Sequence, residues 1–229
     1  GSRAWGFERP DSDYDVRFIY VRPRDWYLRL ERGRDVIETP IDLPWDINGW
    51  DITKALGLML KSNAVVLEWL TSPVVYAKDM AATDMLRAFA DEVLQSSALQ
   101  HHYRRLAVRH CGEFIAGRNE VARKKYLYAL RPALMLMHLR LQGGVPPMSL
   151  PALTRDLPLD TEIRQAIDAF ITAKRQAKES GPDERVPLFD RIIEDEIARA
   201  QPSDTPSPTP ELARRADQLF LELLLSGLS

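Results

Sequence analysis

Apolar and polar residues alternate near the start of the chain, and this pattern predicts a β-strand. In YDVRFIYV, residues 14–21, apolar or aromatic side chains recur at every second position. Two further strands are predicted at 34–39 and 43–48, because proline and glycine residues separate these short apolar runs at turn positions.

From residue 52 onward the spacing changes to that of helices. Ile52, Leu56 and Met59 fall on one helical face, and Asp51 stands where an N-cap is expected. The segment 62–73 predicts a short helix. The remaining periodic segments predict longer helices at 80–96, 98–117, 119–142, 160–180, 187–200 and 210–226.

The order of these elements predicts an α+β protein with a small strand-rich part followed by an all-helical part. We expect a first domain over 1–76 and a helical domain over 77–229. The segment 201–210 has four prolines in ten residues, which is typical of a linker.

Composition places the chain among globular proteins. Hydrophobic residues make up 45% and charged residues 28%. No apolar stretch reaches the length of about 18 residues that a membrane span requires, so we expect no membrane association. Cys111 is the single cysteine, which favours a reducing compartment and a cytoplasmic location. Because the sequence does not begin with methionine, we expect part of the protein to precede Gly1 and the first domain to be truncated at its N-terminus.

The charges are distributed unevenly along the chain. Residues 97–142 carry nine Lys and Arg against two Asp and Glu, whereas acidic residues predominate in 1–96 and 143–229. This excess predicts a surface for phosphate or another anionic partner, and the alternative is that these charges only solvate a pair of helices.

Acidic and phosphate-binding residues cluster at the first predicted strand. Asp13 and Asp15 are two positions apart, so in an extended strand their carboxylates lie on the same side and favour a cation between them. Magnesium prefers such hard oxygen ligands. Gly1 and Ser2 offer close backbone approach and a hydroxyl for a phosphate group, and Arg3 adds a positive charge.

This arrangement resembles the signature of the polymerase-β-type nucleotidyltransferase superfamily. In that signature, Gly-Ser is followed after ten residues by Asp-h-Asp-h, where h is apolar or aromatic. The matching residues are Gly1, Ser2, Asp13, Tyr14, Asp15 and Val16. Further blocks resemble the YcgL-type predicted nucleotidyltransferases, an RNA-repair-associated polymerase-β-like family. These blocks run from residue 1 to about 132 and read GSRAWGF, DSDYDVRFIYV, DVIETPID, DINGWDITKAL, LKSN, LEWLTSP and KKYLYALRP.

The resemblance implies a small mixed sheet with helices, followed by a helical domain that helps to hold the nucleotide or substrate. It also implies a nucleotidyltransferase that uses two Mg²⁺ ions, with Asp13, Asp15 and a third carboxylate as catalytic metal ligands. Asp46 is the favoured third carboxylate because apolar residues flank it in a predicted strand. Asp51 and Asp42 are the alternatives.

A nucleotide site follows from the same resemblance and from the basic helices. Lys124, Tyr128 and Arg131 share one helical face, where a ring could stack on a base and cations could meet phosphates. The predicted nucleotide-binding residues are Gly1, Ser2, Arg3, Lys61, Lys124, Lys125, Tyr128 and Arg131.

Three functions remain open from the sequence. The first transfers a nucleoside monophosphate from a nucleoside triphosphate to a hydroxyl acceptor, with an RNA end favoured by the basic segment. The second uses a protein or small-molecule acceptor. The third is a catalytically silent antitoxin or binding module. The histidines at positions 101, 102, 110 and 138 lack the spacing of a zinc site.

Overall fold

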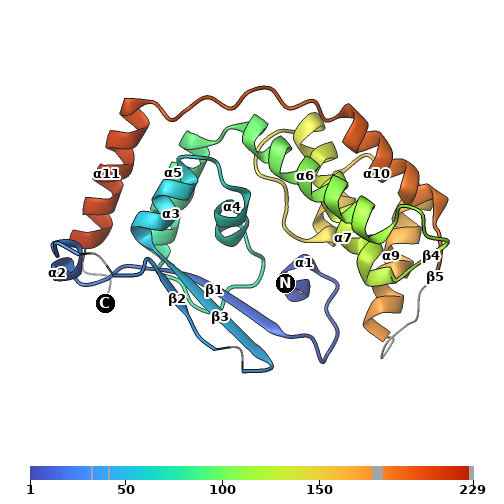
Figure 1. The fold of residues 1–229 in the computed structure, drawn as a ribbon, viewed down its shortest axis with the longest axis horizontal. Helices are drawn as coiled ribbons and strands as arrows, with labels where there is room; N and C mark the ends of the chain where they lie inside the picture. The colour runs from blue at the N-terminus through green and yellow to red at the C-terminus, as the bar shows by residue number, and fades with distance from the viewer. Residues whose placement is uncertain (32, 41, 177–182, 227–229) are drawn as a thin grey trace. The chain divides into compact units, whose positions relative to one another are not determined.

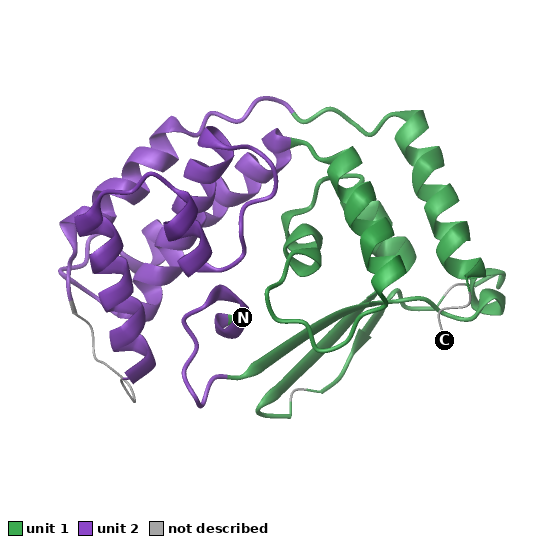
Figure 2. Cartoon of the chain, turned by 180° about the vertical axis from the view of Figure 1, so that it is seen from behind, with its two compact units in different colours: residues 1, 13–95, 205–229 green, residues 2–12, 96–204 purple. Residues whose placement is uncertain are grey.

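The computed structural model describes residues 1–229 except 32, 41, 177–182 and 227–229. It contains two compact units, which Figure 2 shows in different colours: one comprises residues 1, 13–95 and 205–229, and the other 2–12 and 96–204. The α+β class is confirmed, because a mixed sheet near the N-terminus is followed by a mostly helical chain. The functional division into a catalytic domain over 1–76 and a helical domain over 77–229 stays a prediction.

The first unit is built on a three-stranded sheet with the order β1-β3-β2 (Figure 1). Strand β1 (Tyr14–Tyr20) pairs in parallel with β3 (Trp45–Asp51), and β2 (Val36–Glu38) pairs with β3 in the antiparallel direction. The third strand starts later than the 43–48 expected from the sequence. Asp42 and Trp45 bridge each other across a tight turn, so regular pairing begins only at Trp45 and then runs to Asp51.

Helices pack beside this sheet in the same unit (Figure 1). They are α2 (Arg24–Tyr27), α3 (Ile52–Met59), α4 (Ala64–Leu70), α5 (Met80–Val93) and α11 (Pro210–Leu225). Each of the last four begins where a side-chain oxygen caps it. The expected cap of α3 is confirmed, since Asp51 accepts a hydrogen bond from the Thr53 amide at 2.9 Å. Trp50 of β3 stacks on Trp69 of α4 at 3.9 Å between ring centroids, which joins the sheet to the helices.

The second unit is helical, and its long central helix is α7 (Arg123–Leu141). Most of α7 is buried because α6 (Ser96–Phe114) and α10 (Pro187–Arg199) pack along it. The unit also contains α1 (Ser2–Trp5), α8 (Leu150–Asp156), α9 (Thr161–Gln176) and a short ribbon of β4 (Glu120–Val121) and β5 (Asp183–Glu184).

The short elements α1, α2, α8, β4 and β5 were not predicted from the sequence, since none is long enough to show a clear period. The helix expected at 119–142 begins only at Arg123, because residues 120–121 pair with β5 instead. The helix expected at 160–180 is described as far as Gln176, and its last four positions lie outside the described residues.

Candidate active site

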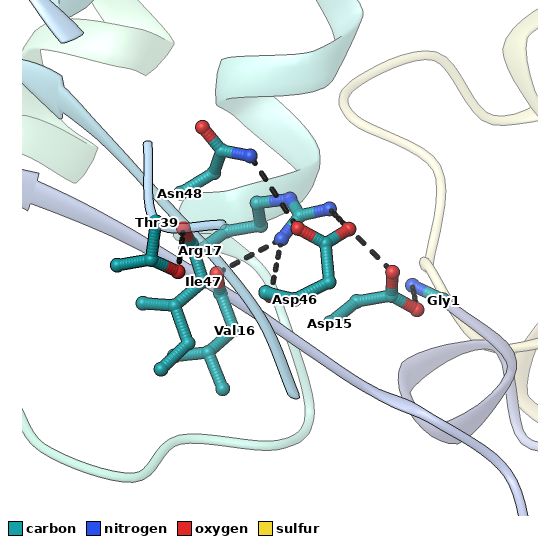
Figure 3. Close-up of polar contacts among 8 residues, drawn as sticks. All are labelled: Gly1, Asp15, Val16, Arg17, Thr39, Asp46, Ile47 and Asn48. Atoms are coloured by element: carbon teal, nitrogen blue, oxygen red, sulfur yellow. Dashed lines mark hydrogen bonds and ion pairs between the residues drawn. The ribbon is translucent and has the colours of Figure 1, made fainter. Parts of the chain in front are cut away.

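Two of the predicted catalytic carboxylates lie side by side on the sheet. Asp15 of β1 is the register partner of Asp46 of β3, and because the two strands run in parallel both side chains point to the same face (Figure 3). The residues are 31 positions apart in the chain, so their proximity depends on the strand pairing. This register places two acidic groups where a cation can be shared.

Arg17 contacts both of these carboxylates (Figure 3). Its Nη2 donates to Asp46 Oδ2 at 2.6 Å and lies 3.5 Å from Asp15 Oδ1. Its Nη1 donates to the backbone carbonyls of Val16, at 3.0 Å, and Asp46, at 2.7 Å. The hydrogen bond from Arg17 holds the pKa of the Asp46 carboxyl below its usual range, so Asp46 is ionised at neutral pH.

Gly1 passes directly over Asp15. Its amino nitrogen lies 3.4 Å from Asp15 Oδ2, and a Cβ added at Gly1 would lie 1.5 Å from the same oxygen. At such a distance the Asp15 side chain would have to move to admit any residue larger than glycine. The glycine of the Gly-Ser pair and the second aspartate are therefore matched to each other in space.

The other aspartates are placed differently. Asp13 is exposed and lies immediately before β1, two residues from Asp15. Asp51 is fully buried, caps α3 and accepts a hydrogen bond from the Tyr27 hydroxyl at 2.9 Å. Asp42 is exposed in the turn before β3. Of the three alternatives for the third carboxylate, Asp46 is the one that the structure brings next to Asp15.

Lys61 is exposed at the turn that follows α3, and the described residues give it no side-chain hydrogen bond or ion pair. It is not part of the group around Asp15 and Asp46 that Figure 3 shows. Its predicted contact with a nucleotide stays a prediction.

Six of the predicted nucleotide-binding residues belong to the helical unit. They are Ser2, Arg3, Lys124, Lys125, Tyr128 and Arg131. Trp5 of α1 packs edge-on against Tyr128 of α7, with ring centroids 5.6 Å apart. The Arg131 guanidinium lies 4.7 Å from the Trp5 ring. The segment 2–12 is thus docked on the helix that carries the other predicted residues.

Cations surround the aromatic rings at this place. Lys124 and Lys125 lie 5.6 and 5.9 Å from the Tyr128 ring centroid. Arg131 is buried and donates to the Met148 carbonyl at 3.0 Å, so it supports Trp5 and the loop before α8. The two lysines, Tyr128, Ser2 and Arg3 belong to the same compact unit, and their contact with a nucleotide stays a prediction.

Two basic residues that contact segment 2–12 were not predicted from the sequence. Lys174 of α9 is buried, donates to the Phe7 carbonyl and lies 4.9 Å from the Phe7 ring. Burial lowers its pKa to about 8. Arg175 donates to the Gly6 carbonyl at 2.9 Å. A signal was present, because Ile167, Ile171 and Lys174 follow the apolar spacing of the helix and a lysine at such a position needs a buried acceptor.

The donor set fits a divalent cation at Asp15 and Asp46. Both groups offer hard oxygen ligands on one face, and Asp46 is held ionised. Among the described residues no group of three or more His, Cys, Asp or Glu side chains is arranged as a complete metal site, so the fit rests on this pair with Asp13 nearby.

In the described part of the chain, no helix combines the length and apolar character needed to cross a bilayer.

Comparisons with known proteins identify the family of the chain. The RlaP family, described as the RNA repair pathway DNA polymerase beta family, matches residues 1–222. The uncharacterized protein YcgL of Bacillus subtilis (strain 168) is 40% identical over 199 residues, which are 87% of this chain and 76% of that protein. No solved structure matches the chain. The resemblance seen in the sequence is confirmed, and the chain belongs to the RNA repair pathway DNA polymerase beta family.

Proposed function

We propose that this protein is a magnesium-dependent nucleotidyltransferase of the cytoplasm that transfers a nucleoside monophosphate from a nucleoside triphosphate to the hydroxyl group at an RNA end. The observation that supports this proposal best is the register of Asp15 and Asp46, with Gly1 crossing over Asp15. Membership of an RNA repair family and the net positive charge of residues 97–142 favour RNA as the acceptor.

Asp13, Asp15 and Asp46 would hold two Mg²⁺ ions. When bound there, magnesium neutralises the triphosphate charge and lowers the pKa of the attacking hydroxyl. Asp46 is better suited to ligation than to general-base catalysis, because the hydrogen bond from Arg17 lowers its pKa and so weakens it as a proton acceptor. The acceptor proton then leaves to solvent.

Residues of the helical unit would bind the nucleotide. Ser2 and Arg3 would contact the phosphates, Lys124 and Lys125 would balance their charge, and Tyr128 offers a ring for stacking. In the reaction, the acceptor oxygen forms a bond to the α-phosphorus, and the bond from that phosphorus to the pyrophosphate oxygen breaks. Catalysis by such a site depends mainly on positioning and charge stabilisation.

The test is a transfer assay with each labelled nucleoside triphosphate, Mg²⁺ and a short RNA. The proposal expects label on the RNA with the unchanged protein and none with Asp15→Asn or Asp46→Asn. Asp84→Asn serves as the matched control, since Asp84 is an exposed carboxylate on α5.

Other outcomes identify the two alternatives. Label on protein or on a small molecule, with none on RNA, would replace RNA by another acceptor. No labelled product with any triphosphate, from a protein that is folded and binds a macromolecular partner, would support a silent binding module and overturn the proposal.

A further inference from the structure

Arg17 is tied to the sheet through one nitrogen and faces the two acids with the other. Nη1 donates to carbonyl oxygens on both strands, those of Val16 on β1 and Asp46 on β3. Since the guanidinium group is planar and rigid, these two bonds also fix the place of Nη2. The charged end of Arg17 is therefore held at the junction of β1 and β3.

Nη2 occupies a position from which one cation can contact both acids. It contacts one oxygen from each carboxylate, Asp15 Oδ1 and Asp46 Oδ2, and these are the oxygens that face each other across the strand pair (Figure 3). A metal ion coordinated by both carboxylates through these oxygens would occupy the space that the guanidinium nitrogen fills. The two cations exclude each other there.

The sequence places this arginine by the same alternation that places the acids. Asp13, Asp15 and Arg17 are spaced by two residues, so a strand that carries the acids on one face also carries Arg17 there. The register partner of Arg17 is Asn48, whose amide lies 3.4 Å from Asp46 Oδ1. No acidic residue is paired with Arg17 on β3, so its charge is directed toward Asp15 and Asp46.

We propose that Arg17 is the internal counter-cation of this site: it keeps Asp15 and Asp46 side by side in the metal-free protein, and it must be displaced before both acids can share a divalent cation. This inference rests on the proposed function, because it concerns metal loading of the same carboxylates. Arg17 is a positioning residue, and its effect on the reaction acts through the two acids.

The exposure of the three groups makes such an exchange feasible. The side chains of Arg17, Asp15 and Asp46 are 26%, 33% and 27% exposed. Ion pairs at partly exposed positions are screened by water and are weak, so a divalent cation that contacts both carboxylates can replace one guanidinium nitrogen. Metal binding then has to overcome only a modest competing interaction.

The experiment measures binding of Mn²⁺ alone, by calorimetry and by electron paramagnetic resonance, without nucleotide or turnover. Arg17→Gln removes the competing charge, and we expect it to bind Mn²⁺ about tenfold more tightly than the unchanged protein, equivalent to about 1.4 kcal/mol. Arg17→Lys keeps a cation, so its affinity should stay closer to that of the unchanged protein. Unfolding in EDTA should show that Arg17→Gln lowers the stability of the metal-free protein, because the two carboxylates then repel each other.

A matched control separates competition from the general loss of a positive charge. Arg34→Gln removes an arginine that is paired with Glu38 beside the same sheet, and its Mn²⁺ affinity should remain within about twofold of the unchanged protein. Asp15→Asn and Asp46→Asn should both lose Mn²⁺ binding.

The outcomes distinguish this inference from the function on which it rests. Equal or weaker Mn²⁺ binding by Arg17→Gln, with binding by the unchanged protein, would overturn the role of Arg17 and leave the proposed metal dependence intact. A folded protein in which neither form binds Mn²⁺ would overturn both. Tighter Mn²⁺ binding by both Arg17→Gln and Arg34→Gln would also refute the role of Arg17, since the loss of any positive charge would then be enough to raise the affinity.

Discussion

Asp46 and Asp51 lie on the same strand, but we expect Asp46 to act in catalysis and Asp51 to stabilise the fold. Replacing each residue by alanine tests this difference. Asp46→Ala removes a carboxylate that is 27% exposed and paired with Arg17. Asp51→Ala removes a fully buried carboxylate that caps α3 and accepts from the Tyr27 hydroxyl. The first change should abolish nucleotidyl transfer, and the second should mainly destabilise the fold.

The magnitudes follow from these contacts. Loss of an exposed ion pair costs about 0.2–1 kcal/mol, so Asp46→Ala should leave the free energy of unfolding nearly unchanged. Loss of an N-cap costs about 1 kcal/mol. A buried hydroxyl left without its acceptor costs about 1–3 kcal/mol, so the total for Asp51→Ala is about 2–4 kcal/mol.

Urea unfolding followed by circular dichroism measures the free energy of unfolding, and the assay with labelled triphosphate measures nucleotidyl transfer. If Asp51→Ala proves too unstable to assay, Asp51→Asn keeps a capping oxygen and should retain transfer activity, whereas Asp46→Asn should not. Equal destabilisation by the two alanine variants, or activity that survives Asp46→Asn and disappears in folded Asp51→Asn, would refute the assignment of the third carboxylate.

Three further predictions test other parts of the structure. Gly49→Ala places a Cβ 2.3 Å from the Phe18 ring and should lower the free energy of unfolding in urea by about 1–3 kcal/mol. At Gly57 on α3 an added Cβ meets nothing within 4 Å, so Gly57→Ala should raise the free energy of unfolding by about 0.5–1 kcal/mol. The pKa of Lys174 falls to about 8 on folding, so between pH 8 and the usual 10.5 the unfolded chain binds more protons than the folded protein. The free energy of unfolding should therefore rise with pH across this interval, and Lys174→Met should lack this rise. Lys124→Ala should weaken binding of a nucleoside triphosphate roughly tenfold in a fluorescence titration, and unchanged affinity would exclude Lys124 from the nucleotide site.

The sequence was sufficient to predict the regular elements with a clear period, because the alternation of β1 and the helical spacing of α3 are local properties. The cap at Asp51 was also local. The choice of Asp46 was favoured by its apolar neighbours, but its pairing with Asp15 depends on register, which no local pattern determines.

Contacts between distant parts of the chain were beyond the reach of the sequence. Segment 2–12 was expected within the first domain over 1–76, but its residues pack in the helical unit, where Trp5 contacts Tyr128 and Phe7 contacts Lys174. These pairs are separated by more than 120 positions, and periodicity reports only on neighbours within one element. The Gly-Ser pair is therefore divided, with Gly1 counted in one compact unit and Ser2 in the other.

The position of Arg17 on the strand could have been predicted from alternation alone, but its contacts with both acids could not. In an extended strand, Asp13, Asp15 and Arg17 would share a face, so the sequence alone could have placed an arginine beside two acids. Only the strand register shows that its guanidinium nitrogen contacts one oxygen from each of Asp15 and Asp46, which lie on different strands. A strand that carries its own counter-cation can hold paired carboxylates together without metal. If that is its role, metal affinity and the stability of the metal-free protein must change in opposite directions when Arg17 is replaced, whereas a residue needed only for folding would not raise the affinity.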